Sequence, residues 1–136
     1  MDLLKAMQMA AKGMKAQGAR MRVVSENLAN AETTGKKAGQ APYRRQIITF
    51  KNELNRADNT REVQVDKIVG DKADFVLKYD PSHPAADEKG YVQMPNVNSL
   101  IEMMDMREAQ RSYEANLGII EMARSMLTRT IDLLRS

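Results

Sequence analysis

The chain of 136 residues contains no cysteine and no tryptophan, and aromatic side chains make up only 4% of it. Without cysteine it can form neither disulfides nor thiolate metal sites. Large aromatic residues usually dominate a compact core, so the packing here must come from Leu, Ile, Val, Met and Ala. A chain of this length is one domain or one elongated unit.

Proline is scarce and confined to the middle of the chain, between Pro42 and Pro95. The proline-free flanks on either side can both be helical along most of their length. We therefore expect a mainly α protein, whose long N- and C-terminal helices pack as a coiled-coil-like pair around a small β-hairpin and extended-loop insert. The expected organisation is an N-terminal helix in residues 1–34, the insert in residues 35–95 and a C-terminal helix in residues 96–136.

The first flank carries a heptad repeat that predicts a helix with one apolar seam. Apolar residues recur every seven positions, at Met7, Met14, Met21 and Leu28. The second column of the seam is Leu3, Ala10, Gln17 and Val24, in which Gln17 is the one polar residue. Such spacing is typical of a helix that packs against another helix. Gly13 and Gly18 lie beside the seam, where each costs a helix about 1 kcal/mol relative to Ala. We interpret them as positions of close helix contact.

The second flank has a wider apolar surface than one partner helix can cover. We predict that this helix begins near Asn98-Ser99, because Ser99 and Glu102 have the spacing of a capping box. Its apolar residues spread over roughly 200° of the helix, about twice the stripe that faces a single core. The remaining surface must be buried in an assembly. The predicted assembly interface is Met7, Met14, Met21, Leu28, Met106, Tyr113, Leu117, Ile120, Leu127, Ile131 and Leu134.

The insert contains three predicted strands, at residues 43–50, 63–69 and 75–79, which are rich in β-branched and aromatic residues. The last two strands would form a hairpin through a turn at Gly70-Asp71-Lys72. The segment Asp80–Pro84 should be extended and stiff, because each proline restricts itself and the residue before it.

The residue types needed for catalysis or ligand binding are missing or scattered. His83 is the only histidine, whereas triad chemistry needs a histidine beside a nucleophile and an orienting acid. The nearby acids Asp80, Asp87 and Glu88 do not follow the EF-hand pattern, and there is no glycine-rich phosphate loop. We expect no enzymatic activity, no cofactor, no metal and no small-molecule substrate.

Nucleic-acid binding and membrane insertion are not expected either. The net charge is only +3, and a nucleic-acid binder would more often combine basic clusters with stacking aromatics. No apolar run approaches the ~20 residues of a membrane span. The first residues lack the charged region, apolar run and cleavage site of a signal peptide.

Three passages resemble the flagellar axial family, which comprises the rod and hook proteins of the bacterial flagellum. The first is Ser25-Glu26-Asn27-Leu28-Ala29-Asn30, followed by Thr33 and Gly35. The second runs from Tyr79-Asp80-Pro81-Ser82-His83-Pro84 to Pro95-Asn96, and this passage is similar to proximal-rod members. The third includes Tyr113-Glu114-Ala115-Asn116 in the second helix. The motif positions are Asn27, Asn30, Asp80, Pro81, Pro84, Asn96, Glu114 and Asn116.

The resemblance implies a structural subunit of the proximal rod that polymerises through its terminal helices and transmits motor torque across the periplasm. It also implies contacts with adjacent copies and other flagellar rod subunits, and export by the flagellar type III apparatus without a cleavable signal peptide. The family's common Thr-Pro-Gly-Tyr is here Thr33-Thr34-Gly35-Lys36, which changes the local loop.

Two questions stay open at the level of the sequence. Phe50 and Leu54 resemble the short element by which rod and hook subunits engage the export gate, but Phe50 could equally pack within a strand. The heptads and the lack of chemistry also fit a cytosolic coiled-coil adaptor or export chaperone. That alternative gives no reason for the stiff segment between Asp80 and Pro95.

Overall fold

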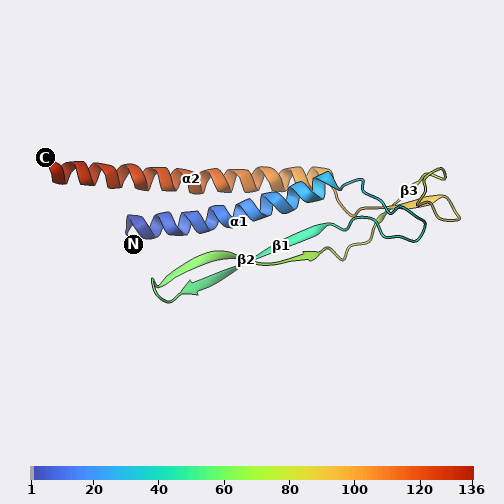
Figure 1. Cartoon of the computed structure of the whole chain (residues 1–136), viewed down its shortest axis with the longest axis horizontal. Helices are drawn as coiled ribbons and strands as arrows, with labels where there is room; N and C mark the ends of the chain where they lie inside the picture. Colours follow the sequence, from blue (N-terminus) through green and yellow to red (C-terminus); the bar gives the residue numbers. More distant parts are fainter. Residues whose placement is uncertain (1) are drawn as a thin grey trace. The chain divides into compact units, whose positions relative to one another are not determined.

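The computed structural model describes residues 2–136 of the chain (Figure 1). Within the described residues, one long helix precedes four strands in the sequence and a second long helix follows them. The elements are α1 (Leu3–Ala29), β1 (Gln46–Asn55), β2 (Thr60–Gly70), β3 (Val76–Tyr79), β4 (Tyr91–Met94) and α2 (Ser99–Arg135). Among the described residues, no helix is both long enough and apolar enough to cross a membrane.

The prediction of a mainly α protein with one small hairpin is wrong. Helices account for 47% of the chain and strands for 21%, and the strands form two separate antiparallel sheets. Each sheet has two strands: β1 pairs with β2, and β3 pairs with β4. The predicted hairpin between residues 63–69 and 75–79 does not form, because those segments belong to different sheets. Terminal helices with β-structure between them are present as expected.

A four-residue turn at residues 56–59 closes the β1–β2 hairpin. Asn59 adopts a positive φ of 54°, a conformation that asparagine tolerates better than most residues. The Asn55 side chain accepts a hydrogen bond from the backbone N–H of Ala57 at 3.1 Å. The turn contains neither glycine nor proline, the two residues that most strongly indicate a turn in a sequence.

The chain forms two compact units, and α1, α2, β1 and β2 each contribute to both. The first unit contains the α1 residues up to Met21, residues 49–67 and residues 107–136. Its buried apolar side chains are alanines: Ala10, Ala16, Ala109 and Ala123. The helices can approach closely because their contact is made of small side chains. A Cβ at Gly13 would lie 2.8 Å from Nδ2 of Asn116, whereas Gly18 has no such neighbour within 4 Å.

The second unit contains residues 22–48 and 68–106. Its core combines the apolar side chains Val23, Val24 and Val92 with two buried polar ones, Asn27 and Glu102. In the β3–β4 sheet, Val76 lies opposite Met94 and Tyr79 lies opposite Tyr91. Val92 of β4 points into the core, whereas all four residues of β3 are exposed.

The helix α2 begins with a different cap from the one predicted. The Asn98 side-chain oxygen accepts hydrogen bonds from the backbone N–H groups of Leu100 and Ile101, at 3.1 and 3.4 Å. Asn98 is therefore the N-cap, and Glu102 does not close a capping box with Ser99. Asparagine and serine are both favourable N-cap residues, so the sequence alone does not show which of the neighbours Asn98 and Ser99 is the cap.

Replacing Asn98 with alanine should lower the free energy of unfolding by about 1 kcal/mol, because two helix N–H groups lose their acceptor. Ser99→Ala is the matched control and should change stability by less than about 0.5 kcal/mol. Thermal unfolding followed by circular dichroism compares the two. A larger effect from Ser99→Ala would restore the predicted capping box.

Candidate functional site: a buried polar cluster and an exposed apolar face

A buried carboxylate stands at the centre of the second unit. Glu102 on α2 has none of its surface exposed, and its Oε1 accepts a hydrogen bond from Nε of Arg45, just before β1. The same guanidinium pairs with Asp71 at 3.2 Å and with Asp105 at 3.6 Å. Burial opposes the charge of Arg45, but hydrogen bonding to Glu102 and Asp71 outweighs it and raises the pKa of Arg45. Arg45 therefore stays charged and ties three acidic side chains together.

Asn27, near the end of α1, uses all four hydrogen-bonding positions of its amide in this cluster. Its Oδ1 accepts from the backbone N–H of Gln46 at 2.9 Å and from the Tyr43 hydroxyl at 2.8 Å. Its Nδ2 donates to the carbonyl of Gln46 at 2.9 Å and to Oε2 of Glu102 at 3.3 Å. The amide thus pairs with the start of β1 as a neighbouring strand would. This role accounts for an asparagine at a motif position.

The Tyr43 hydroxyl is held in the same acidic surroundings. Burial, with the nearby carboxylates of Glu26 and Glu102, raises the pKa of Tyr43. The hydroxyl therefore remains protonated and keeps its hydrogen bond to Asn27 across the ordinary pH range.

Asn96, another motif position, joins the chain before β1 to the turn after β2. Its Oδ1 accepts from the backbone N–H of Arg45 at 2.7 Å, and its Nδ2 donates to the carbonyls of Asp71 and Ala73 at 3.1 Å each. Arg44 donates to the same two carbonyls and lies 4.2 Å over the ring of Phe75. A backbone hydrogen bond from Ala73 and the Arg45 charge lower the pKa of Asp71, although its burial acts the other way. The cluster therefore fixes the insert to both helices.

Asn30 and Asn116, two further motif positions, form hydrogen bonds with the backbone of α1 and α2 respectively. Asn30 donates from Nδ2 to the carbonyl of Glu26 at 2.8 Å and accepts from the Thr33 hydroxyl at 3.1 Å, so it caps the end of α1. Asn116 donates to the carbonyl of Ser112 at 3.0 Å and lies against Gly13. Glu114 is exposed on α2.

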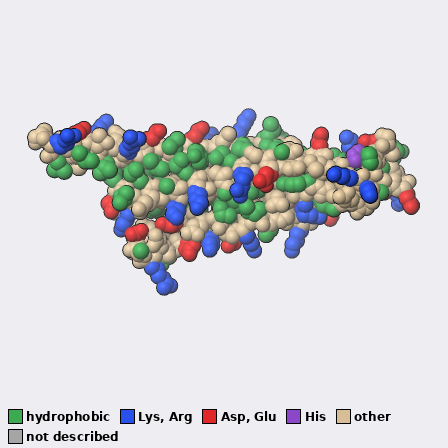
Figure 2. Space-filling model, in the orientation of Figure 1, with side chains coloured by type: hydrophobic (Ala, Val, Ile, Leu, Met, Phe, Trp, Pro, Cys, Tyr) green, Lys and Arg blue, Asp and Glu red, His purple; other side chains and the backbone are tan. Residues whose placement is uncertain are grey.

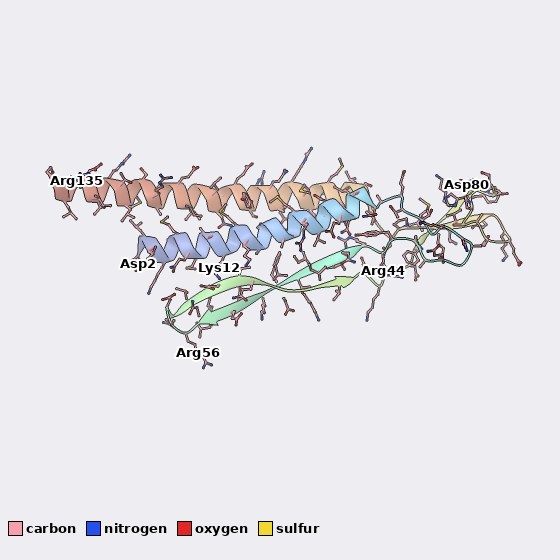
Figure 3. All side chains as sticks on the ribbon, viewed as in Figure 1. Asp2, Lys12, Arg44, Arg56, Asp80 and Arg135 are labelled. Atoms are coloured by element: carbon pink, nitrogen blue, oxygen red, sulfur yellow. The ribbon has the colours of Figure 1, made fainter. Side chains whose placement is uncertain are left out.

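The segment Asp80–Pro84 forms turns, so the prediction of an extended segment is wrong. The backbone N–H of His83 donates to the carbonyl of Asp80 at 3.1 Å, and the Ser82 hydroxyl donates to Oδ1 of Asp80 at 2.8 Å. Pro81 packs where a Cβ on Gly90 would lie, and Pro84 is exposed. Figure 3 shows Asp80 beside the β3–β4 sheet. Proline occurs in turns as well as in extended segments. Here the hydrogen bonds that Asp80 accepts from Ser82 and His83 stabilise the turn.

His83 is a structural residue in this arrangement. Its Nδ1 accepts from the backbone N–H of Ala85 at 3.0 Å, and its Nε2 lies 3.2 Å from the Thr34 hydroxyl. The Ala85 contact requires an unprotonated Nδ1, so the ring hydrogen is on Nε2 and points at Thr34. His83 therefore joins the loop after β3 to the loop after α1.

The predicted interface residues divide into half-buried and exposed groups. Met7, Met14, Met21, Leu28, Met106, Tyr113 and Ile120 are half-buried, while Leu117, Leu127, Ile131 and Leu134 are exposed. Leu117 lies in the middle of α2, whereas Leu127, Ile131 and Leu134 lie in its last third. The end of this helix runs past the start of α1: Arg135 lies beyond Asp2 in Figure 3. Hydrophobic side chains gather along this projecting end (Figure 2). Leu134, near its tip, is 82% exposed.

A second apolar row follows the flank of the same helix, at Ile119, Met122, Met126 and Leu133, and all four are exposed. We call the residues Leu127, Ile131 and Leu134 together with this row the exposed apolar face. Leu127 and Ile119 line grooves beside α1, with Leu3 and Ala10 respectively, and every side chain of this face is at least 45% exposed. At about 1.5–3 kcal/mol for each large apolar side chain that becomes buried, this face can drive association.

The predicted export-gate residues lie on β1. Phe50 and Leu54 are four positions apart on one strand, so their side chains share a face of the hairpin. Both are exposed, which leaves them accessible and removes a core role for Phe50 in the single chain.

The sequence reasoning missed Arg45 and Glu102 as a pair. The sequence analysis assigned Glu102 to a helix cap and gave no role to Arg45. One signal was present: Glu102 lies seven residues before Ala109, in the same heptad column as Ala109, Asn116 and Ala123. A charged residue in a buried column indicates a buried partner.

Two family models match the chain. The model described as "Flagella basal body rod protein" matches residues 7–37, and "Flagellar basal body rod FlgEFG protein C-terminal" matches residues 88–133. These matches cover most of α1 with the first part of the loop after it, and β4 with most of α2. They define the class as flagellar basal-body rod proteins.

Curated relatives extend the match to nearly the whole chain. The flagellar basal-body rod protein FlgC of Agrobacterium fabrum is 51% identical over 96% of this chain and 94% of its own length. FlgC of Borreliella burgdorferi is 39% identical over 99% of both chains, and FlgC of Salmonella typhimurium is 36% identical over 98% of both. The chain belongs to the FlgC family and is a structural subunit of the flagellar basal-body rod. The alternative of a cytosolic adaptor or chaperone finds no support.

Proposed function

We propose that this subunit builds the periplasm-spanning part of the rod by burying its exposed apolar face against neighbouring subunits. Residues 1–34 and 96–136 act as the axial helices, and residues 35–95 act as the insert that braces them. The observation that carries the proposal is the end of α2, which projects past the start of α1, since Arg135 lies beyond Asp2 in Figure 3. Ile131 and Leu134, in the last two turns of this helix, are exposed.

The partners in this proposal are adjacent copies and other rod subunits. A contact between two different surfaces of neighbouring subunits extends an assembly instead of closing it into a dimer. Motor torque then passes through packing that is spread over many side chains, and no catalytic group is needed. The subunit reaches the rod through the flagellar type III export apparatus, and exposed Phe50 and Leu54 are available to its gate.

Replacing Ile131 with glutamate tests the proposal, because a charge at the centre of the exposed apolar face should be expelled from a dry contact. We expect loss of rod incorporation and at least a tenfold loss of swimming, while the purified subunit keeps its helix content. Leaving a charge unpaired in a buried contact costs several kcal/mol, more than enough for this effect.

Ser125→Glu is the matched control, since it adds the same charge to the exposed polar side of the same helix. It should leave assembly and swimming intact. Electron microscopy of isolated basal bodies and immunoblotting of the subunit in them give the readout. Normal incorporation of the Ile131→Glu subunit would refute the proposed contact.

A further inference from the structure

Sulfur chemistry in this chain is confined to thioethers, because the sequence has eleven methionines and no cysteine. Four methionines in residues 2–136 are exposed: Met103 by 56%, Met104 by 63%, Met122 by 65% and Met126 by 49%. The other methionines in this range are half-buried. Methionine oxidises to the sulfoxide, and susceptibility to oxidation follows exposure. An oxidant dissolved in water therefore reaches these four side chains most readily.

The exposed methionines form two pairs on α2. Met122 and Met126 are four residues apart, so their side chains lie on the same side of the helix, and both belong to the exposed apolar face. Met103 and Met104 lie near the start of α2, in the second unit and outside that face. The two pairs have the same chemistry and comparable exposure. They differ in whether the proposed assembly contact covers them.

Oxidation would reverse the polarity that the exposed apolar face needs. A peroxide transfers one oxygen atom to the thioether sulfur: the O–O bond breaks, the S–O bond forms, sulfur is oxidised by two electrons and water leaves. The product is a polar, chiral sulfoxide in place of a flexible apolar side chain. The exposed apolar face consists only of Leu, Ile and Met side chains, none of which can donate a hydrogen bond. A sulfoxide oxygen buried there would lose its hydrogen bonds to water.

We propose that Met122 and Met126 form an oxidation-sensitive site that keeps a subunit out of the rod while either one is a sulfoxide. A dithiol-dependent sulfoxide reductase restores the thioether: it removes the sulfoxide oxygen as water while two thiols become a disulfide. Assembly covers both side chains, so only the unassembled subunit responds to peroxide. This inference rests on the proposed contact of the exposed apolar face and adds a chemical control over it.

Leucine replacements test the site, because leucine is apolar, similar in size and has no sulfur to oxidise. Cells that lack methionine sulfoxide reductase receive a pulse of hydrogen peroxide, and rod assembly is switched on after the peroxide is removed. Immunoblotting of isolated basal bodies compares each strain with its own untreated culture. Incorporation of the parent subunit should fall at least fivefold. Incorporation of the Met122→Leu, Met126→Leu double variant should fall less than twofold.

The matched control is the Met103→Leu, Met104→Leu double variant, which should lose incorporation as the parent does. Mass spectrometry of the parent adds a measurement without substitutions. Subunits in the basal bodies should carry at least tenfold less sulfoxide at Met122 and Met126 than the unassembled subunits, and equal sulfoxide at Met103 and Met104. In cells that contain the reductase, incorporation of the parent should recover.

Equal losses in the parent and the Met122→Leu, Met126→Leu variant would overturn the inference, as would protection by the Met103→Leu, Met104→Leu variant. If such a result accompanied exclusion of Ile131→Glu subunits, the oxidation site would fail and the proposed α2 contact would stand. Normal incorporation of Ile131→Glu subunits would refute the contact itself, and this inference with it.

Discussion

Replacing Glu102 with alanine is expected to lower the free energy of unfolding by about 3–5 kcal/mol, because it leaves the Arg45 guanidinium partly buried without its main partner. Glu102 is wholly buried and also accepts a hydrogen bond from Asn27, so that amide loses a contact as well. Asp71 and Asp105 remain near Arg45, which places the effect toward the lower end of the range. Urea unfolding of the purified subunit measures it.

Glu108→Ala is the matched control on the same helix. Glu108 pairs with Arg20 at 3.4 Å, but its side chain is 67% exposed, and surface ion pairs of this kind contribute little. The control should therefore change stability by less than about 0.5 kcal/mol. Equal effects from the two substitutions would mean that the polar cluster does not hold the insert to the helices.

Replacing Asn27 with aspartate should destabilise the fold by about 2–4 kcal/mol at neutral pH while barely changing the shape of the side chain. The new carboxylate can no longer donate to the carbonyl of Gln46. It also faces the Glu102 oxygen that Asn27 now contacts at 3.3 Å. Two carboxylates in one buried site repel each other, so one of them takes up a proton more readily than in the unfolded chain.

The sign of the pH dependence distinguishes this explanation from simple loss of packing. The folded pKa of one carboxyl in the Asn27→Asp variant lies above its unfolded value, so the penalty is largest above that folded pKa and shrinks as the pH falls through it. In the parent chain the lowered pKa of Asp71 acts in the opposite sense: its stabilisation is present above the unfolded pKa and is lost as the pH falls through the folded pKa. The difference in the free energy of unfolding between the Asn27→Asp variant and the parent should therefore become smaller as the pH falls.

Asn52→Asp provides the control for an added carboxylate, because Asn52 is exposed on β1. It should differ from the parent by less than about 0.5 kcal/mol. Urea unfolding at several pH values between neutrality and mild acid compares the three proteins. A gap between Asn27→Asp and the parent that stayed constant or widened in acid would contradict the paired-carboxylate explanation.

The two long helices could be predicted from the sequence because their signals are local. The absence of proline and the heptads at Met7 to Leu28 and Met106 to Leu134 favour helix regardless of what surrounds them. The excess of apolar surface on the second helix also follows from its sequence alone. For residues 2–136, the structure adds which of these side chains are exposed, namely Leu127, Ile131, Leu134 and the row from Ile119 to Leu133.

The strand pairing could not be predicted, because alternation of residue types indicates a strand but not its neighbour. The β1–β2 hairpin depends on a turn at Asn59 that carries no glycine or proline, whereas the glycine at Gly70 suggested a turn that does not form a hairpin. The strand β4 consists of only four residues. Such a short strand is stabilised by Val92 in the core and by its pairing with β3, neither of which is a local property.

The buried polar cluster could not be predicted from the sequence for a related reason. Asn27 and Glu102 are 75 residues apart, and nothing in either neighbourhood indicates the other. The resemblance marked Asn27 and Asn96 as motif positions without giving a reason for them. The hydrogen bonds give that reason, because both amides replace backbone partners for the chain around β1.

Amide hydrogen exchange, measured by mass spectrometry on the isolated subunit and on basal bodies, tests the central claim most directly. Residues 117–135 should exchange rapidly in the free subunit and become strongly protected in the rod, whereas the segments around Asn27, Arg45 and Glu102 should be protected in both. Equal exchange of residues 117–135 in the two samples, whether fast or slow, would show that no neighbouring subunit covers the projecting end of α2.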